Sequence, residues 1–173
     1  NDITALASPG ALAAVAGSDC AVCLMHMRGE PRTMQEAPAY ADVVREVREF
    51  LQARVAASRA AGIADDRLVL YPGFGFGKSL AHNLALFRAL TATACDGLPL
   101  LVGISRKSML GAITGQPVES RLAASIAAAV LAVQKGAKIL RVHDVAETRD
   151  ALAVLAADQA GRRPVGRLRR SAD

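Results

Sequence analysis

Four short apolar runs in the sequence each end abruptly in a cluster of glycine and polar or charged residues. The runs are residues 21–25, 68–71, 100–103 and 139–142. Uninterrupted apolar runs of this kind are typical of parallel strands that are buried on both faces of a sheet. In such folds the chemistry gathers at the carboxyl ends of the strands. The pattern therefore predicts a parallel sheet, with its candidate site in the polar clusters that follow the strands.

The segments between these runs have helical periodicity. The helix boundaries follow from three signals. They are an apolar stripe with charged residues opposite it, Ser79 as an amino-terminal cap, and Gly62 and Gly136 as stop signals. Asp144 followed by Glu147 resembles a capping box that opens the last helix. The predicted helices are residues 42–61, 79–94, 119–135 and 144–160. The alternation of strand and helix, one unit in roughly thirty to forty-five residues, leaves an open doubly wound sheet or part of a (β/α)8 barrel as candidates.

Composition is that of a soluble globular protein. The chain has 173 residues, of which 52% are hydrophobic, enough for the core of one domain. No stretch resembles a signal peptide, and the longest apolar run, residues 122–133, is too short to cross a bilayer. The three cysteines are most simply buried thiols in a reducing compartment. We therefore expect a cytoplasmic protein.

Positive charge is concentrated at the carboxyl end. The net charge is +5, and residues 161–173, with five arginines and one aspartate, supply +4 of it. A basic segment after the last helix is expected to be a disordered, solvated tail, which leaves residues 1–160 as one domain. Two tyrosines and four phenylalanines offer few rings on which nucleic-acid bases could stack. Nucleic acid is therefore not an expected partner.

The second cluster, residues 72–78, is rich in glycine but fits neither familiar phosphate-binding motif. Pro72 stands where a Walker loop needs glycine, and Lys78 stands where the dinucleotide fingerprint needs glycine or alanine. Closely spaced glycines, including Gly75, alternate with Phe74 and Phe76. This pattern lets backbone approach a flat ligand while a ring packs against it. The alternative is a tight turn after a strand.

The third cluster carries cations and hydroxyl groups. Ser105, Arg106, Lys107 and Ser108 follow the strand that ends at Gly103, and they stand at the start of a predicted helix. Helix amino termini favour carboxylates and phosphates, and arginine and lysine add charge-assisted donors. The cluster therefore predicts an anionic ligand.

The fourth cluster contains Arg141 and His143. They are two residues apart, so on an extended strand they face the same side and can grip one phosphate together. A lone histidine or arginine would more often be structural, and His26 in the first cluster can equally be a packed histidine. No cluster has the spacing of metal ligands, so we predict no metal held by this chain.

In the order in which they occur, these clusters resemble the motifs of dihydropteroate synthase. The motifs are residues 26–29 with 31–35, residues 72–78, residues 105–108 and residues 141–145, and residues 1–3 resemble the end of the family's fourth strand. The resemblance runs to about Ala160. It implies a (β/α)8 barrel, of which this chain covers the part from the end of strand 4 to strand 8.

The resemblance also implies an activity and its partners. It implies an enzyme of folate synthesis that joins 6-hydroxymethyl-7,8-dihydropterin diphosphate to p-aminobenzoate and releases diphosphate. Sulfonamides would inhibit it by mimicking p-aminobenzoate. Mg²⁺ would share the charge of the diphosphate, and the protein would be a homodimer through helices of its carboxyl-terminal half.

Site roles follow from the same resemblance. Lys107, Arg141 and His143 would be catalytic, with Arg141 and His143 on the diphosphate and Lys107 between the pterin and the aminobenzoate. Phe76 and Arg106 would flank the aminobenzoate ring, and Ser108 would hold its carboxylate. The substrate-binding positions that it implies are Asn1, Met25, Tyr71, Gly75, Phe76, Gly103, Ser105, Arg106, Lys107, Ser108, Arg141 and His143.

Two departures from the family pattern are expected to matter. Tyr71 stands where the family has an aspartate that accepts paired hydrogen bonds from the pterin, and a neutral phenol cannot accept such a pair. We expect pterin affinity to fall at least about a hundredfold as a result. The chain also starts inside the fourth unit, so we expect a fragment with little turnover of its own, whose magnesium ligand lies in the amino-terminal part.

Two alternative functions remain. A non-catalytic or repurposed homologue would bind another flat ligand or only a phosphate, and Tyr71 favours it. A pterin-binding methyltransferase domain would share the barrel, but residues 105–108 and the pair Arg141 and His143 argue against it, because methyl transfer has no diphosphate to hold.

Overall fold

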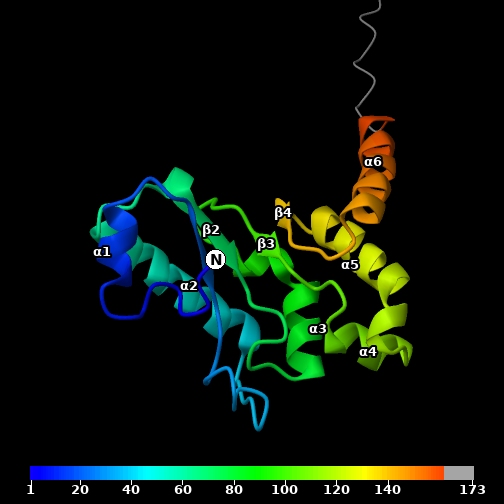
Figure 1. Ribbon diagram of the computed structural model, residues 1–173, viewed down its shortest axis with the longest axis horizontal. Helices are drawn as coiled ribbons and strands as arrows, with labels where there is room; N and C mark the ends of the chain where they lie inside the picture. The colour runs from blue at the N-terminus through cyan, green and yellow to red at the C-terminus, as the bar shows by residue number, and fades with distance from the viewer. Residues whose placement is uncertain (162–173) are drawn as a thin grey trace, which may run out of the picture.

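A computed structural model of the chain describes residues 1–161 (Figure 1). All four apolar runs form strands at their predicted places. The strands are β1 (Val22–Met25), β2 (Leu68–Tyr71), β3 (Leu101–Val102) and β4 (Ile139–Leu140). The last two are shorter than their runs, because the chain turns away from the sheet as soon as the glycine and polar residues begin.

The strands lie side by side in sequence order and run parallel. In the pair β1 and β2, Val22 lies opposite Leu68, and in the pair β3 and β4, Leu101 lies opposite Ile139. A single parallel bridge from Leu70 to Leu100 joins the two pairs. A further parallel bridge, from Asp2 to Leu24, places the start of the chain beside β1. The predicted parallel sheet is thus confirmed, and its carboxyl ends lie along one edge.

Helices connect and cover these strands. They are α1 (Ala11–Ala16), α2 (Val43–Ala60), α3 (Leu80–Arg88), α4 (Ser108–Thr114), α5 (Leu122–Gln134) and α6 (Val145–Gly161), with short 3-10 helices at Asp65–Arg67, Leu90–Thr93 and Val118–Ser120. The predicted helix 79–94 is α-helical only to Arg88, and the predicted helix 119–135 starts as a 3-10 turn. Helix α1 was not predicted from the sequence.

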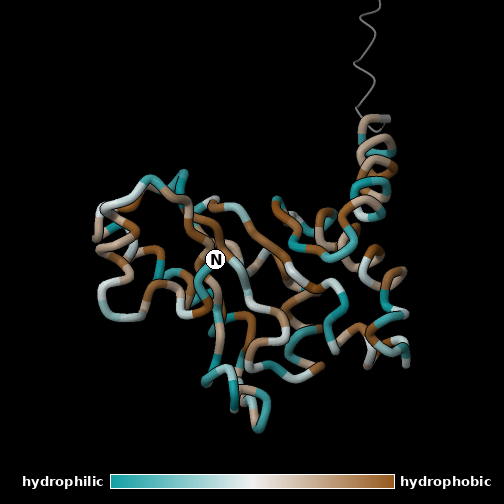
Figure 2. Tube along the Cα trace, in the orientation of Figure 1, coloured by the Kyte–Doolittle hydropathy of each residue, from teal (hydrophilic) through white to brown (hydrophobic). Residues whose placement is uncertain are grey.

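Helix α2 shows how the sequence sets the packing. The carboxylate of Asp42 accepts hydrogen bonds from the backbone N–H groups of Val44 and Arg45, which caps the first turn. One face then carries a buried stripe, Val43, Val47, Leu51 and Val55, that packs against the sheet. Hydrophobic residues run along the strands in Figure 2, as expected for a sheet that helices cover.

Three expectations need correction or fall outside the described residues. The carboxylate of Asp144 does not act in the predicted capping box with Glu147; it accepts hydrogen bonds from the guanidinium of Arg106, a stronger charged donor. Cys20 is exposed, because it precedes β1, whereas Cys23 and Cys95 are buried thiols as expected. The predicted tail, residues 161–173, lies beyond the described residues except for Gly161, where α6 ends. Within residues 1–161, no helix is both long and apolar enough to span a membrane.

Candidate functional site

The polar clusters that follow β3 and β4 line one cavity. It has a volume of about 170 Å³ and is lined by Gly103, Ser105, Lys107, Arg141, Val142 and His143. These side chains come from two loops that are far apart in the sequence and meet because β3 and β4 are neighbours. The sequence prediction that these clusters converge at the carboxyl ends of the strands is therefore confirmed in its geometry.

Ser105 orients His143 in this cavity. The hydroxyl of Ser105 lies 3.0 Å from Nδ1 of the His143 ring and accepts a hydrogen bond of 3.3 Å from the His143 backbone N–H. The backbone N–H of Arg141 donates to the carbonyl of Val102 at 2.9 Å, which extends the pairing of β4 by one residue. Arg141 and His143 thus sit on a short, well-anchored segment and line the same cavity, as predicted from their spacing.

Lys107 contacts Tyr71 and the glycine-rich segment. Its ammonium lies 3.1 Å from the phenol oxygen of Tyr71, donates to the carbonyl of Phe74, and lies 4.4 Å from the centroid of the Phe76 ring. The phenol of Tyr71 in turn donates to the carbonyl of Gly103 at 2.9 Å. Lys107, Tyr71 and Gly103 therefore form one chain of hydrogen bonds across the ends of β2 and β3.

Burial shifts the ionisation of both side chains. Burial, with Arg141 adding repulsion, lowers the pKa of Lys107 to about 8. Burial raises the pKa of Tyr71 well above its usual value, against the opposing effect of Arg141. Tyr71 is therefore a neutral phenol at physiological pH, and the pair presents an ammonium without a carboxylate partner.

Residues 73–77 form a tight loop in which glycine is required. Gly73, Gly75 and Gly77 have φ angles of +73°, +78° and +63°, in the left-handed region. A Cβ atom on Gly73 would overlap the carbonyl oxygen of His26, and one on Gly77 would overlap that of Arg28. The loop therefore packs directly on the segment that follows β1. The tight-turn interpretation and the ligand-approach interpretation both fit this geometry.

Arg106 adopts a conformation that is unusual for a residue with a side chain. Its φ is +59°, and this strained turn is held from α5, because its N–H donates to the hydroxyl of Ser125 at 2.9 Å and its carbonyl accepts from Arg121 at 3.0 Å. Its guanidinium, 42% exposed, pairs with Asp144.

Ser108 begins α4. Phe76 contacts Tyr71 and Lys107, so Phe76 and Arg106 turn to different partners.

The remaining predicted positions lie near the other edge of the sheet. Met25 is 1% exposed and lies opposite Tyr71 in the pairing of β1 and β2. Asn1 is exposed and precedes the bridge from Asp2 to Leu24. The roles assigned to all of these residues from the resemblance stay predictions.

Sequence reasoning gave no role to Lys78, to Asn83 or to Ser125. All three are polar and nearly fully buried, at 3%, 3% and 5% exposure. A lysine at the end of a glycine-rich segment was visible in the sequence, but its burial was not. The signal that could have found it is a lysine directly after a run of closely spaced glycines, because the backbone carbonyls of such a loop need side-chain donors.

The described residues hold no cluster of side chains that would bind a metal ion by themselves. Within residues 1–161, no three histidine, cysteine, aspartate or glutamate side chains gather closely enough to hold a metal. Asp144, the carboxylate next to His143, is already paired with Arg106. The predicted Mg²⁺ ligand, expected in the amino-terminal part, stays a prediction, and no step of the chemistry is assigned to the ion.

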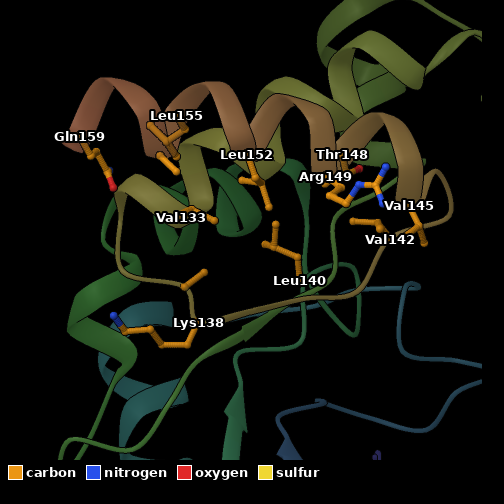
Figure 3. A pocket seen from close by; sticks show the side chains of 12 residues that line it. Val133, Lys138, Leu140, Val142, Val145, Thr148, Arg149, Leu152, Leu155 and Gln159 are labelled. Atoms are coloured by element: carbon orange, nitrogen blue, oxygen red, sulfur yellow. The ribbon is translucent and has the colours of Figure 1, made fainter. Parts of the chain in front are cut away.

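A larger cavity of the described residues lies elsewhere. It has a volume of about 600 Å³ and separates α6 from β4 and the end of α5. Figure 3 shows Leu140, Val142, Leu152 and Leu155 around it, with the charged ends of Lys138 and Arg149 at its rim. None of the predicted site residues lines it. It marks the open side of β4, where Ile139 is 40% exposed.

Comparison with known proteins gives one family. The model of the family described as pterin binding enzyme matches residues 1–143. The dihydropteroate synthase of Escherichia coli (strain K12) is 51% identical over 157 residues, which cover 91% of this chain and 56% of that protein. The enzyme of Haemophilus influenzae is 51% identical over 154 residues, covering 89% of this chain and 56% of its own length. The chain spans about half the length of the curated relatives that it matches.

Solved structures that resemble this chain belong to the same family as its sequence relatives. Dihydropteroate synthase of Yersinia pestis, in a complex with a sulfonamide drug, superposes with a TM-score of 0.89 at 48% identity, covering 92% of this chain and 58% of the other. The dihydropteroate synthase of Burkholderia cenocepacia, in a complex with 7,8-dihydropteroate, superposes with a TM-score of 0.87 at 51% identity. The match covers 93% of this chain and 60% of the other. The neighbours confirm the fold class as the (β/α)8 barrel, of which this chain forms a part. With a family model matched over residues 1–143, the chain belongs to the pterin binding enzyme family.

Proposed function

We propose that this chain is the carboxyl-terminal part of a dihydropteroate synthase. Such an enzyme condenses 6-hydroxymethyl-7,8-dihydropterin diphosphate with p-aminobenzoate to give 7,8-dihydropteroate and diphosphate. The observation that carries the proposal is the cavity at the strand ends, where Lys107, Arg141 and His143 converge with Ser105. Relatives that are about half identical over nearly the whole chain bear the same name.

Arg141 and His143 hold the diphosphate in this proposal. A guanidinium and an imidazole on one wall of a small cavity can donate charge-assisted hydrogen bonds to phosphate oxygens. Ser105 keeps the His143 ring in place through Nδ1, at 3.0 Å, so that Nε2 is free to face the ligand. Binding the leaving diphosphate more tightly than the intact substrate lowers the barrier to its departure.

The aminobenzoate lies on the side of Lys107. Phe76 offers a ring face, Ser108 offers its hydroxyl at the start of α4, and Arg106 would bring positive charge to the carboxylate on leaving Asp144, with which it is paired. A relative from Xanthomonas albilineans was solved with 4-aminobenzoic acid, and the Yersinia pestis enzyme with a sulfonamide drug. By analogy, sulfonamides compete with p-aminobenzoate at this site.

The reaction then needs little covalent chemistry from the protein. Diphosphate leaves, a cation remains on the exocyclic methylene of the pterin, and the aromatic amine attacks that carbon and loses a proton. Lys107, between the two substrates, fixes their relative position, which is the main source of acceleration in such a reaction. Asn1 and Met25 contact the pterin on the β1 side.

The complete enzyme includes more than this chain. The described sheet has two outer edges, at the segment of Asp2 and at β4, and a longer chain would close it into a barrel. We propose that the complete protein is a cytoplasmic homodimer that requires Mg²⁺, and that residues 1–173 alone turn over little or no substrate.

Tyr71 favours a second candidate, a homologue that has lost pterin binding. Its neutral phenol is 1% exposed, and by the family resemblance it stands where a pterin-binding aspartate is expected. Such a protein would keep the anion site of Arg141 and His143 and bind a different flat ligand or only a phosphate.

Release of diphosphate tests the proposal. The chain is joined to the amino-terminal part of the Escherichia coli relative and supplied with pterin diphosphate, p-aminobenzoate and Mg²⁺. Diphosphate release that depends on p-aminobenzoate and is lost in Arg141→Ala, but not in the surface variant Lys138→Met, supports a synthase. Phosphate or diphosphate binding without turnover supports the second candidate, and methyl transfer from a folate in place of diphosphate release would indicate a methyltransferase.

A further inference from the structure

The loop of residues 73–78, called here the glycine loop, has its backbone carbonyls satisfied by side chains. The left-handed glycines prevent a regular ladder of backbone hydrogen bonds, so these carbonyls need other donors. Every carbonyl from Gly73 to Lys78 accepts a hydrogen bond from a side chain. The pairs are Lys78 with Gly73 and Phe76, Lys107 with Phe74, Gln35 with Gly75, Tyr40 with Gly77, and Asn83 with Lys78.

Lys78 is the central donor of this set. It is 3% exposed, and its ammonium lies 2.9 Å from the carbonyl of Gly73, 3.0 Å from that of Phe76 and 2.8 Å from Nδ1 of His26. An ammonium has three N–H donors and no acceptor, so each donor has a partner and Nδ1 must be the unprotonated nitrogen of His26. The buried charge is thus solvated entirely by the loop and by one ring.

His26 ties this arrangement to the sheet. It is 3% exposed, its N–H donates to the carbonyl of Tyr71 at 3.0 Å, and its ring packs edge-on against Phe50 at 5.0 Å. The ring therefore cannot move without disturbing β1, β2 and α2. Through it, Lys78 connects the glycine loop to the most rigid part of the protein.

Two lysines, Lys78 and Lys107, bind carbonyls of the glycine loop, and their surroundings differ. Lys107 reaches Phe74 and the Phe76 ring and lines the cavity with Arg141. Lys78 lies on the buried side and does not line that cavity. Lys78 instead lines a separate cavity of about 120 Å³ with Asn83 and Ser108, but its ammonium is taken up by the loop carbonyls and the His26 ring, whereas Lys107 is placed to touch a ligand.

We propose that Lys78 is a positioning residue whose buried ammonium, held by His26, fixes the glycine loop so that Gly75 and Phe76 face the ligand site. The identity of the ligand, p-aminobenzoate, rests on the proposed function. The loop geometry can be tested without any ligand.

The charge of Lys78 is sensitive to neutral pH. Burial, followed by repulsion from Lys107 and Arg28, lowers the pKa of Lys78 to about 7. Burial, followed by Lys78 and Arg28 and opposed by Glu46, lowers the pKa of His26 to about 3, so the ring stays neutral. When Lys78 loses its proton it retains two donors, and the neutral amine can no longer make all three bonds.

The first test compares Lys78→Met with the exposed control Lys138→Met in the 173-residue chain. Amide hydrogen exchange is measured at Gly75, whose N–H donates to Asn83 at 2.8 Å, and at Phe76, whose N–H donates to Gly73 at 3.1 Å. We expect exchange at both amides to accelerate at least about tenfold in Lys78→Met, with exchange in α2 unchanged and with Lys138→Met like the original chain. Unchanged loop exchange in a folded Lys78→Met protein would overturn the proposal.

A second test needs no variant and decides the case if Lys78→Met does not fold. Nitrogen-15 spectra of the unaltered chain are recorded from pH 5.5 to 9. We expect a slowly exchanging lysine ammonium and an unprotonated Nδ1 of His26 at low pH. The ammonium signal is lost as pH rises through the pKa of Lys78, and exchange at Gly75 then accelerates beyond its intrinsic pH dependence. A protonated Nδ1 of His26 at low pH would overturn the proposal.

Titration with p-aminobenzoate, on the chain joined to the amino-terminal part of the Escherichia coli relative, separates this inference from the proposed function. If the unaltered chain binds and a folded Lys78→Met binds at least about tenfold more weakly, both stand. Equal binding by the two overturns the positioning role. If the unaltered chain does not bind, the proposed function is weakened, and the exchange measurements alone decide whether Lys78 fixes the loop.

Discussion

The phenol of Tyr71, at the end of β2, donates a hydrogen bond of 2.9 Å to the carbonyl of Gly103, which follows β3. The same oxygen receives a hydrogen bond from Lys107 at 3.1 Å. Tyr71 thus links two strand ends and engages the lysine that the family resemblance assigns to both substrates. It therefore engages the Gly103 carbonyl and the Lys107 ammonium within the protein.

Removing this hydroxyl should weaken the fold. Tyr71→Phe keeps the ring and leaves the Gly103 carbonyl without its donor and Lys107 without one acceptor. We expect the free energy of unfolding to fall by about 1 to 2 kcal/mol. Urea denaturation of the two proteins at neutral pH measures the difference. An unchanged midpoint would mean that water replaces the phenol without penalty.

Two glycines with nearly the same backbone angle should respond differently to alanine. Gly73 and Gly115 have φ angles of +73° and +72°, but a Cβ on Gly73 overlaps the carbonyl of His26, whereas one on Gly115 meets nothing within 4 Å. We expect Gly115→Ala to cost about 1 kcal/mol and Gly73→Ala at least about 3 kcal/mol. Thermal and urea denaturation check this. Equal losses would show that the loop can move off His26.

The fold was largely predictable because its strands are uninterrupted apolar runs. All four strands and the helices α2, α3, α5 and α6 lie close to where apolar patterns and capping signals placed them. Helix α1 was missed because its six residues are short and none is buried, so it leaves no amphipathic signal. The end of α3 differs most, because α3 stops at Arg88 and residues Leu90–Thr93 form a 3-10 helix instead.

The candidate site was predictable in part. Positions directly after strands, such as Lys107, Arg141 and His143, could be predicted to converge because parallel strands end at one edge. The supporting contacts could not. The pairing of Lys78 with His26, 52 residues apart, depends on how the glycine loop folds back over β1, and no local pattern encodes that distance.

Acid should destabilise the protein through His26. The folded state holds the pKa of His26 at about 3, mainly by burial and then by the charges of Lys78 and Arg28, while an unfolded histidine titrates near 6.5. Between these values the unfolded state binds more protons, so the free energy of unfolding falls as pH drops below about 6.5. We expect His26 to account for a loss of about 2 to 3 kcal/mol between pH 6.5 and 4.

Urea titrations of the original chain and of His26→Gln across this range measure that contribution. The variant is less stable at neutral pH but should lose less stability on acidification. Parallel pH profiles for the two proteins would contradict the assignment.

Ser125 should stabilise the strained turn at Arg106. Its hydroxyl accepts from the Arg106 N–H at 2.9 Å and donates to the carbonyl of Arg121 at 2.7 Å. Ser125→Ala leaves a half-buried N–H unpaired, and we expect a loss of about 1 to 2 kcal/mol. The exposed Ser120→Ala is the control and should change stability by less than about 0.5 kcal/mol. Similar effects of the two substitutions would remove the role of Ser125.

The most direct test of the account is the affinity for pterin diphosphate of the chain joined to the amino-terminal part of the Escherichia coli relative. Calorimetric titration with Mg²⁺ present compares the protein carrying Tyr71 with its Tyr71→Asp variant. If the phenol closes a pterin site that is otherwise intact, the aspartate variant binds at least about a hundredfold more tightly. Equal affinity in the two proteins would contradict that claim.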